Sequence, residues 1–405
     1  MIVKTVVVAA TLCLPTFAAA ADEGWDVGLD LTAEGSASLS GGAQTGRALH
    51  GLALVHGDWK QVEKQADDLK YTGYVSVLAL AGKGPTERFL GDFLAASNME
   101  GFPSVRLYSW WLEASRHDWT LRGGALLADE EFAGTDAGGN FFNSAFGWPA
   151  FISANTVNTG PAFYVAAPGL RLERTWGETA AWRFGIYDGD AFDSPSGDPA
   201  VTRSGLHYKL GGAQGWFLIT EATWAPSGGV TRFKAGAWLH TAAFADVRDD
   251  ASGQPFAVSG NDPRQYGSNH GTYAAVERTL AGESGKPGDI EAFVRGGFSP
   301  ADRNAISWAV DAGLAWTGPI PGRPKDVAAL GIAHAAFSSR YADNARATDP
   351  ASPPPDFETA IEANYTFTFS EHINLQPDIQ YIRHPGGSSA RNDAVVFLLR
   401  LNSTY

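Results

Sequence analysis

The feature that most constrains the fold is a period-2 alternation of apolar and polar residues, which recurs along almost the whole chain. The clearest case spans 306–316, where one parity holds Ile306, Trp308, Val310, Ala312, Leu314 and Trp316 and the other holds Ser307, Asp311 and Gly313. In 358–369, Glu358 and Glu362 fall on the polar parity. Successive side chains of a β-strand point to opposite faces, so the pattern predicts strands with one apolar and one polar face. A soluble β-sandwich and a transmembrane β-barrel would both show it.

The spacing of the tryptophans favours the barrel. Trp308 and Trp316 lie eight residues apart, and so do Trp216 and Trp224. With a rise of ~3.3 Å per residue and a tilt of ~40°, eight residues climb ~20 Å along the membrane normal. Aromatic girdles border the apolar band of an outer-membrane barrel, which is ~25 Å tall. The 13 Trp, 12 Tyr, 23 Phe and 47 Gly also suit short strands and turns better than helices.

The two ends of the chain are typical of an exported barrel protein. Lys4, an apolar run over 5–17 and small residues at 18–21 predict a signal peptide at 1–21, with the barrel over 22–405. The only cysteine, Cys13, lies in that signal, which excludes disulfides and thiol chemistry in the mature chain. The last strand, 395–405, alternates and ends on Tyr405, similar to the assembly signal of outer-membrane barrels, although Ser403 interrupts its apolar face.

Charge and hydropathy narrow the class further. The formal net charge is −14, and it becomes −15 without the single lysine of the signal. A strongly acidic chain is a poor partner for nucleic acid. No later segment is apolar for 18 residues, so no membrane-spanning helix is expected. Helix signals are confined mostly to 59–70.

Counting strands gives seventeen candidates, one more than a barrel with both ends on the same side allows. The candidates are 27–39, 46–57, 71–81, 104–114, 118–127, 163–175, 181–188, 203–210, 214–225, 231–242, 271–279, 289–298, 306–317, 327–338, 358–369, 372–383 and 392–404. Long connections belong outside and short turns on the periplasmic side. Residues 128–162 and 243–270 are both too long for periplasmic turns, so both should lie outside. They can lie on the same side of the membrane only if one candidate strand between them does not span it. Residues 203–210, near Gly211, Gly212 and Gly215, are therefore assigned to an outer loop. The prediction is a 16-stranded antiparallel transmembrane β-barrel with short periplasmic turns and long outer loops.

The outer loops are expected at 40–45, 82–103, 128–162, 189–213, 243–270, 299–305, 339–357 and 384–391. Several are acidic, and the acids include Asp190, Asp193, Asp198, Asp246, Asp249, Asp250, Asp262, Asp343, Asp349 and Asp356. A solvated surface explains them. A sharper hypothesis is that they bridge divalent cations to the phosphates of outer-leaflet lipid, lipopolysaccharide included.

Several long segments, in the right order, resemble the carbohydrate-selective porins of the OprB type. They are SNMEGFPSVRLYSWWLE at 97–113, RGGALLADEEFAGTDAGGNFFNSAFGWPAFISAN at 122–155, NLQPDIQYIRHPGG at 374–387, GRPKD at 322–326 and SPADRN at 299–304. One departure is Ala114, where such proteins usually carry Gln. The resemblance implies a 16-stranded barrel in the bacterial outer membrane, sugar uptake, and a channel narrowed by outer loops. It also favours a monomer.

The connection 128–162 is far longer than a turn needs, and its 140–149 core, NFFNSAFGWP, is too aromatic for a freely solvated loop. We therefore expect it to fold inward as a constriction loop. Phe141, Phe142, Phe146 and Trp148 are expected to anchor it, and Trp148 is the leading candidate to offer a flat apolar face to a sugar ring. The alternative is that all four rings only pack.

Charged partners of a sugar should come from inward strand positions. Alternation places Arg122, Arg171, Glu173 and Arg183 on the lumen side. Arg106 and Glu113 have opposite parity on one strand, so at most one is expected to face the lumen squarely, with Arg106 near a rim. Acids at the start of the loop, Asp129, Glu130 and Glu131, would set opposing charges across the pore. A water-filled barrel is polar inside in any case, so each position also has this plainer explanation.

Signals of an enzyme are poor. The nine histidines are scattered, with His207 and His240 read as ordinary polar positions, and neither HExxH, GxSxG nor a phosphate loop occurs. The sequence thus predicts a passive outer-membrane porin for carbohydrates and other small hydrophilic solutes, without metal or cofactor. The alternatives are a general diffusion porin without sugar preference, a barrel hydrolase, and a structural or adhesive barrel.

Overall fold

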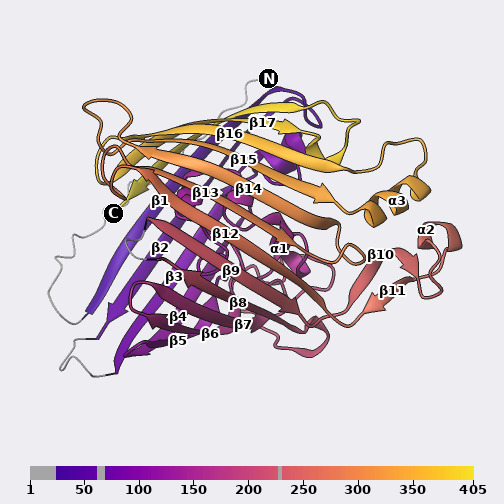
Figure 1. Ribbon diagram of the computed structural model, residues 1–405, viewed down its shortest axis with the longest axis horizontal. Helices are drawn as coiled ribbons and strands as arrows, with labels where there is room; N and C mark the ends of the chain where they lie inside the picture. Colours follow the sequence, from indigo (N-terminus) through magenta and orange to yellow (C-terminus); the bar gives the residue numbers. More distant parts are fainter. Residues whose placement is uncertain (1–23, 62–68, 227–229) are drawn as a thin grey trace, which may run out of the picture.

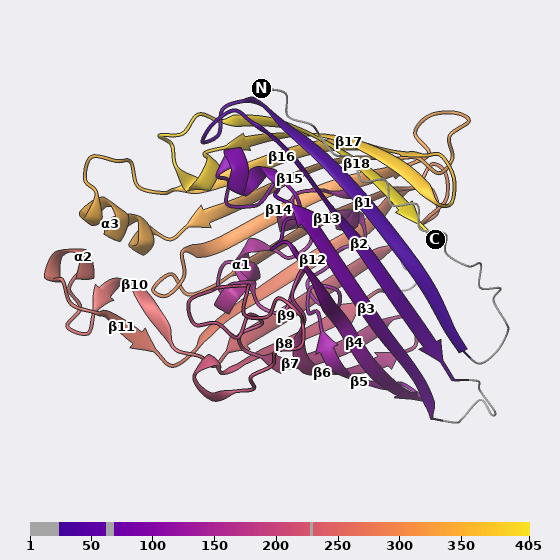
Figure 2. The ribbon, with the colours of Figure 1, turned by 180° about the vertical axis from the view of Figure 1, so that it is seen from behind.

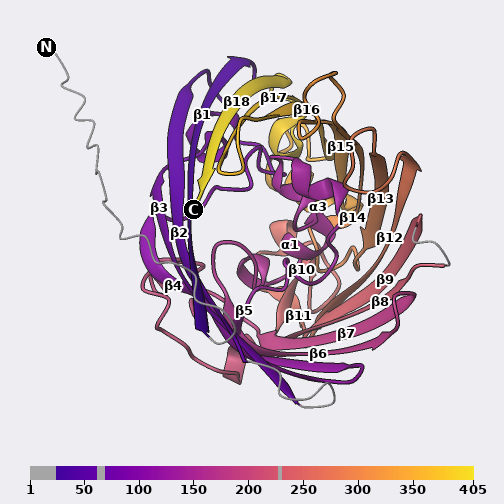
Figure 3. The same cartoon turned by 90° about the vertical axis from the view of Figure 1, so that its left-hand side faces the viewer.

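The computed structural model describes residues 24–61, 69–226 and 230–405, and sixteen of its strands close into one antiparallel barrel. Figures 1 and 2 show the strands from opposite sides, and Figure 3 looks along the barrel. Around the wall the order is β1-β18-β17-β16-β15-β14-β13-β12-β9-β8-β7-β6-β5-β4-β3-β2. The wall strands are β1 (Gly24–Ser40), β2 (Arg47–Lys60), β3 (Lys70–Gly82), β4 (Ser104–Arg116), β5 (Trp119–Leu126), β6 (Ala167–Trp176), β7 (Ala180–Asp188), β8 (Trp216–Trp224), β9 (Thr231–His240), β12 (Asn269–Ala281), β13 (Ile290–Phe298), β14 (Ile306–Thr317), β15 (Val327–Phe337), β16 (Phe357–Thr368), β17 (Ile373–Arg383) and β18 (Ala394–Thr404).

The remaining elements lie in the connections. They are η1 (Thr86–Leu90), η2 (Ala137–Asn140), η3 (Ser144–Phe146), α1 (Ala150–Ser153), η4 (Val157–Thr159), η5 (Gly212–Gln214), β10 (Phe244–Asp250), α2 (Phe256–Ser259), β11 (Pro263–Tyr266), α3 (Ser339–Thr348) and η6 (Pro385–Gly387). Among the described residues no helix has the length and apolar character needed to cross a membrane.

The strand count is confirmed, including the exclusion of 203–210, which belongs to the loop between β7 and β8. One expectation is wrong in detail. The stretch 59–70 is not helical at its ends, because Trp59 and Lys60 finish β2 and Lys70 starts β3, while 62–68 lies outside the described residues. The connection 243–270 contains a two-stranded sheet, β10–β11, which projects beyond the barrel beside α2 and α3 (Figure 1). The signal peptide assigned to 1–21 also lies outside the described residues.

Alternation sets the two faces of the wall as predicted. On β14, Trp308, Val310, Leu314 and Trp316 are exposed on the outside, whereas Asp311 is buried inside. The exposed outer face is apolar because it meets lipid rather than water. The buried core therefore lies inside the barrel, between the inner wall and two long loops.

Small residues on the inner wall make room for the loop. A side chain at Gly313 or Gly331 would begin 2.8 Å and 2.7 Å from the ring of Phe141, respectively. One at Gly297 would begin 2.5 Å from the ring of Phe151. These aromatic side chains come from the connection between β5 and β6, whose short helical segments lie inside the ring of strands in Figure 3. The inward fold predicted for this connection is therefore present.

Candidate functional site

The connection 127–166, which we call the constriction loop, is held to the wall by side chains of the strands. Glu221 accepts a hydrogen bond from Ala133 N at 2.8 Å, and Glu277 accepts one from Asp136 N at 2.6 Å. Glu362 accepts two, from Phe142 N at 2.6 Å and from Asn143 N at 2.9 Å. Buried backbone N–H groups need hydrogen-bond acceptors. Carbonyl groups of a turn or sheet usually accept these bonds, and here three carboxylates of the wall accept them instead.

Arg295 supplies the opposite kind of contact. Its guanidinium is fully buried and donates to the carbonyl oxygens of Ala145 at 2.7 Å, Phe146 at 2.9 Å and Gly147 at 3.1 Å, and also to that of Ala133. Asp311 balances its charge at 3.0 Å. One side chain thus fixes two stretches of the loop, because a guanidinium carries five donors in a rigid plane.

A second loop, 83–103, is attached to the wall in the same way. Glu358 accepts from Phe93 N at 2.6 Å and Leu94 N at 2.7 Å, and Gln380 donates to Ala96 O at 2.8 Å. The two loops touch each other, since Asn98 N donates to Phe142 O at 2.6 Å. The loops and the inner wall from β8 to β17 therefore form one packed body, which occupies one side of the barrel interior.

Five charged side chains of the facing wall, on β4 to β7, meet one carboxylate of the constriction loop. Arg122 pairs with Glu113 at 2.8 Å and with Glu131 of the constriction loop at 2.7 Å. Arg171 bridges Glu113 at 3.1 Å, Glu131, and Glu173 at 3.1 Å. Arg183 pairs with Glu173 at 3.1 Å. We call Glu113, Arg122, Glu131, Arg171, Glu173 and Arg183 the charge ring. It joins the start of the constriction loop to β4, β5, β6 and β7, and its three cations balance its three anions.

A row of stacked rings continues from the charge ring across neighbouring strands. The Arg122 guanidinium lies 3.9 Å from the centre of the Trp111 ring. Trp111 stacks on Tyr74 at 5.6 Å, and Tyr74 stacks on His56 at 6.1 Å. The rings are nearly parallel, at 17° and 26°, and their centres are offset along the row. The face of Trp111 is thus one of the contacts of the Arg122 guanidinium.

Comparisons with known proteins fit this architecture. Residues 58–405 match the family model described as carbohydrate-selective porin, OprB family. The chain belongs to this family. It is therefore an outer-membrane β-barrel channel for carbohydrates, and a porin rather than an enzyme. It is 25% identical to Porin B of Pseudomonas aeruginosa over 95% of this chain and 88% of that protein. It is 26% identical to the putative porin QuiX of Acinetobacter baylyi over 49% and 47% of the two chains, respectively.

Solved structures show the same fold. The high-pH structure of Pseudomonas putida OprB superposes with a TM-score of 0.82 at 20% identity and covers 94% of both chains. The outer-membrane channel DcaP of Acinetobacter baumannii gives a TM-score of 0.57 at 12% identity, covering 97% of this chain and all of that one. The second likeness is to the general architecture of an outer-membrane barrel.

In this OprB-family porin the predicted lumen residues come together, and one parity argument is wrong. Arg122, Arg171, Glu173 and Arg183 all face inward, as alternation predicts. Arg106 and Glu113 also both face inward, although they were expected on opposite faces. β4 carries a bulge, since Val75 pairs with Trp110 whereas Val77 pairs with Leu107, and the extra residue shifts the parity. Arg106 lies near the outer end of β4, buried, and outside the charge ring.

The two aromatic candidates are packed. Phe142 is fully buried, and the Arg400 guanidinium lies 3.9 Å from its ring centre. Trp148 is only 8% exposed, donates from Nε1 to Thr159 O at 2.8 Å and meets Phe217 edge-on at 6.5 Å. This geometry favours the packing alternative for both rings. A sugar contact at Trp148 stays a prediction.

The acids at the start of the loop have separate environments. Asp129 accepts a hydrogen bond from Phe163 N at 2.9 Å, and burial raises its pKa to about 6. Glu130 reaches lumen water yet is surrounded by protein, and this desolvation, with the charges of Asp129 and Glu131, raises its pKa to about 7. Glu131, rather than either neighbour, enters the charge ring.

Sequence reasoning missed the side chains that anchor the loops: Glu221, Glu277, Arg295, Glu358, Glu362 and Gln380. The parity of Glu358 and Glu362 was predicted correctly, but their role was not. The sequence did carry a signal for these residues. Charged side chains are rarely buried in full, and these stand on strands among bulky apolar residues. Their partners are backbone groups of a distant loop, which no local pattern reveals.

Proposed function

We propose that the charge ring is the constriction and that it selects neutral, hydroxylated solutes such as sugars over ions. The observation that carries the proposal is its charge balance, with three guanidinium groups interleaved between three carboxylates. A sugar hydroxyl can donate to a carboxylate and accept from a guanidinium, so it finds a partner at every point of such a ring. An ion of either sign meets repulsive groups as well as attractive ones.

The solvent exposure of the six side chains supports an assignment of the members that a solute would contact. The side chain of Arg183 is 32% exposed, those of Arg122, Glu113 and Glu173 are 15–18% exposed, and that of Arg171 is 6% exposed. Sugars would therefore contact Arg183, Arg122, Glu113 and Glu173. Arg171 would serve as the inner brace that keeps Glu113, Glu131 and Glu173 in position.

The test is sugar block of ion current in planar bilayers, with Glu113→Gln as the variant. Removing one anion leaves the ring with net charge +1, so anion preference should rise. Glu113 also accepts charge-assisted hydrogen bonds, which are worth ~1.5–3 kcal/mol each. Water competes in an open pore, so the low end applies and sugar block should weaken about tenfold. Glu291→Gln, an inward acid outside the ring, is the matched control. Equal block and equal reversal potential in both variants would contradict the proposal.

We also propose that this porin has no hydrolase activity. The structure places a hydroxyl and an imidazole together on the lipid-facing wall, since His334 Nδ1 lies 2.8 Å from Thr359 Oγ1. His334 packs between the rings of Trp308 and Phe357 at 5.0 Å and 5.3 Å. Within the described ranges no carboxylate is hydrogen-bonded to this imidazole, so the orienting member of a triad is missing. A phospholipase assay on the reconstituted protein should show no release of fatty acid.

The proposal includes a monomeric barrel in contact with outer-leaflet lipid. Cation bridging by the outer acidic loops has less support, because Asp246 and Asp249 are already paired with Arg340 at 3.0 Å and 2.8 Å. The mass of the detergent-solubilised particle, corrected for bound detergent, tests the oligomeric state. A particle of two or three chains would contradict it.

A further inference from the structure

The outer end of β4 lacks its neighbour in the barrel wall. Pairing between β4 and β5 starts at Trp110 and Ala125, so Ser104–Ser109 has no partner strand on that side. The cause is the constriction loop, because the chain leaves the wall after Leu126 and turns inward. An open strand edge exposes unpaired N–H and C=O groups, which proteins normally cover.

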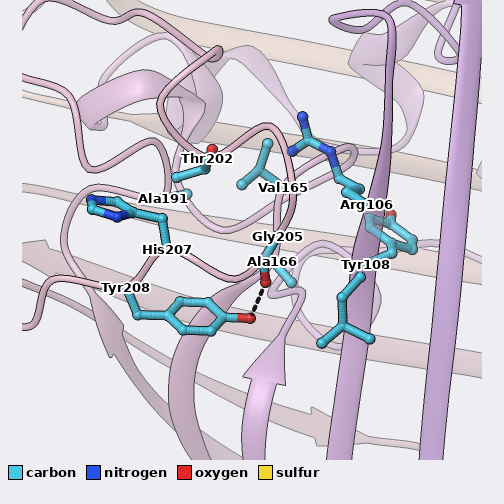
Figure 4. A pocket seen from close by; sticks show the side chains of 10 residues that line it. Arg106, Tyr108, Val165, Ala166, Ala191, Thr202, Gly205, His207 and Tyr208 are labelled. Atoms are coloured by element: carbon cyan, nitrogen blue, oxygen red, sulfur yellow. Dashed lines mark hydrogen bonds between the residues drawn. The ribbon is translucent and has the colours of Figure 1, made fainter.

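Residues 201–210, which we call the strap, cover this edge from the neighbouring outer loop. Leu107 N donates to Ser204 O at 3.0 Å. Gly205, at φ +68°, comes so close that a side chain there would begin 1.8 Å from Leu107 O. Figure 4 shows Thr202, His207 and Tyr208 of the strap beside Arg106 and Tyr108 of β4. The hollow between them is about 10 Å³, room for one water. The strap therefore closes the wall, and a sugar cannot pass there.

The strap also lies on the lipid-facing side. Trp110, which is exposed on the outer face of β4, donates from Nε1 to Tyr208 Oη at 3.2 Å. Leu206 and Leu210, at 68% and 60% exposure, turn apolar side chains outward from the strap. The long loops of the barrel share this end, so the strap meets the outer leaflet.

Basic residues alternate with these apolar ones. Arg203, His207 and Lys209 are exposed and occupy one parity, while Leu206, Tyr208 and Leu210 occupy the other. Arg203 lies 5.4 Å from the ring centre of Phe102, and His207 is 4.0 Å from Asp193. Across the described ranges neither the Arg203 guanidinium nor the Lys209 ammonium has a carboxylate within ion-pair distance. Two full positive charges thus stand beside exposed leucines in a protein of net charge −14.

We propose that the strap is a binding site for lipopolysaccharide, the phosphorylated glycolipid of the outer leaflet. Its phosphates would pair with Arg203 and Lys209, and its acyl chains would lie against Leu206 and Leu210. Charge complementarity and the apolar side chains at the same level of the wall carry the assignment. The same segment covers the open edge of β4, so bound lipid would also hold the wall closed.

The test titrates labelled lipopolysaccharide into the detergent-solubilised, full-length barrel. The variant Arg203→Gln/Lys209→Gln should weaken lipopolysaccharide binding about tenfold, because it removes the two positive charges that would attract the lipid phosphates. The matched control, Lys83→Gln/Arg88→Gln, removes two exposed cations from another outer loop and should bind as wild type. Gly205→Ala should weaken binding too, by lifting the strap, and gel migration before and after boiling reports whether each barrel is folded.

Wild-type affinity in a folded Arg203→Gln/Lys209→Gln barrel would overturn the proposal, as would an equal loss in the control variant. Displacement of the probe by phosphatidylglycerol as readily as by unlabelled lipopolysaccharide would overturn the choice of lipid. Sugar block should stay at wild-type strength in Arg203→Gln/Lys209→Gln and in the control variant, because neither changes a residue of the charge ring or removes the strap from the wall. The site therefore stands or falls independently of the proposed constriction.

Discussion

Replacing Arg295 with methionine should release the constriction loop while leaving the barrel intact. Methionine keeps much of the volume but loses every donor. The carbonyls of Ala145, Phe146 and Gly147 lose partners at 2.7, 2.9 and 3.1 Å. Each charge-assisted bond is worth ~1.5–3 kcal/mol, and lumen water can replace part of it, so the low end gives about 4.5 kcal/mol for three. At 1.4 kcal/mol per factor of ten, the docked population falls about a thousandfold relative to the undocked one.

Single-channel conductance measures the outcome, because a displaced loop widens the pore. We expect larger or rapidly fluctuating conductance in Arg295→Met and wild-type conductance in the control Arg278→Met, whose side chain is exposed on β12. Arg295→Met leaves Asp311 buried without its partner, at a cost of ~3–5 kcal/mol. The double variant Arg295→Met/Asp311→Asn removes that charge and guards against a folding defect. A folded double variant with wild-type conductance would refute the anchoring role.

Three further predictions concern the lumen. Arg122→Ala should lower anion preference and weaken sugar block about tenfold, because the sugar loses a hydrogen bond worth ~1.5 kcal/mol of binding free energy. An unchanged reversal potential and unchanged sugar block would count against the place of Arg122 in the constriction. Trp148→Ala removes a packed ring, which typically costs ~3–5 kcal/mol, so conductance should rise for every solute with ion selectivity unchanged; loss of sugar block alone would instead make Trp148 a sugar contact. Cation preference should rise between pH 6 and pH 8, because Glu130, with its pKa raised to about 7, loses its proton in that range; Glu130→Gln should abolish this dependence, and a persisting slope would implicate another group.

Alternation predicted most of the fold because a barrel strand has one lipid face and one lumen face throughout its length. It failed at β4, where a bulge near Ser109 adds one residue and brings Arg106 and Glu113 to the same face. A bulge changes neither composition nor local hydropathy in a way that a period-2 count detects. The alternation rule therefore assigns faces correctly between bulges but does not predict where a bulge occurs.

The residues that the wall strands contribute to the site could be predicted from the sequence, whereas the residue that the loop contributes could not. Arg122, Arg171, Glu173 and Arg183 follow from strand parity, because the lumen must be polar. The choice of Glu131 over Asp129 and Glu130 depends on how the loop turns after Leu126, which depends in turn on Glu221 and Arg295 across the barrel. Trp148 shows the same limit, since its sequence context does not distinguish a packed ring from an exposed one.

The most direct test of the central claim is liposome swelling with neutral sugars, compared with charged solutes of matched size. A charge-balanced ring behind an anchored loop predicts that liposomes containing the wild-type barrel swell faster in monosaccharides than in amino acids of similar size that carry a net charge. It also predicts that Glu113→Gln narrows this difference for anionic amino acids while slowing sugar entry. Equal swelling rates for sugars and charged solutes in the wild-type barrel would contradict the account.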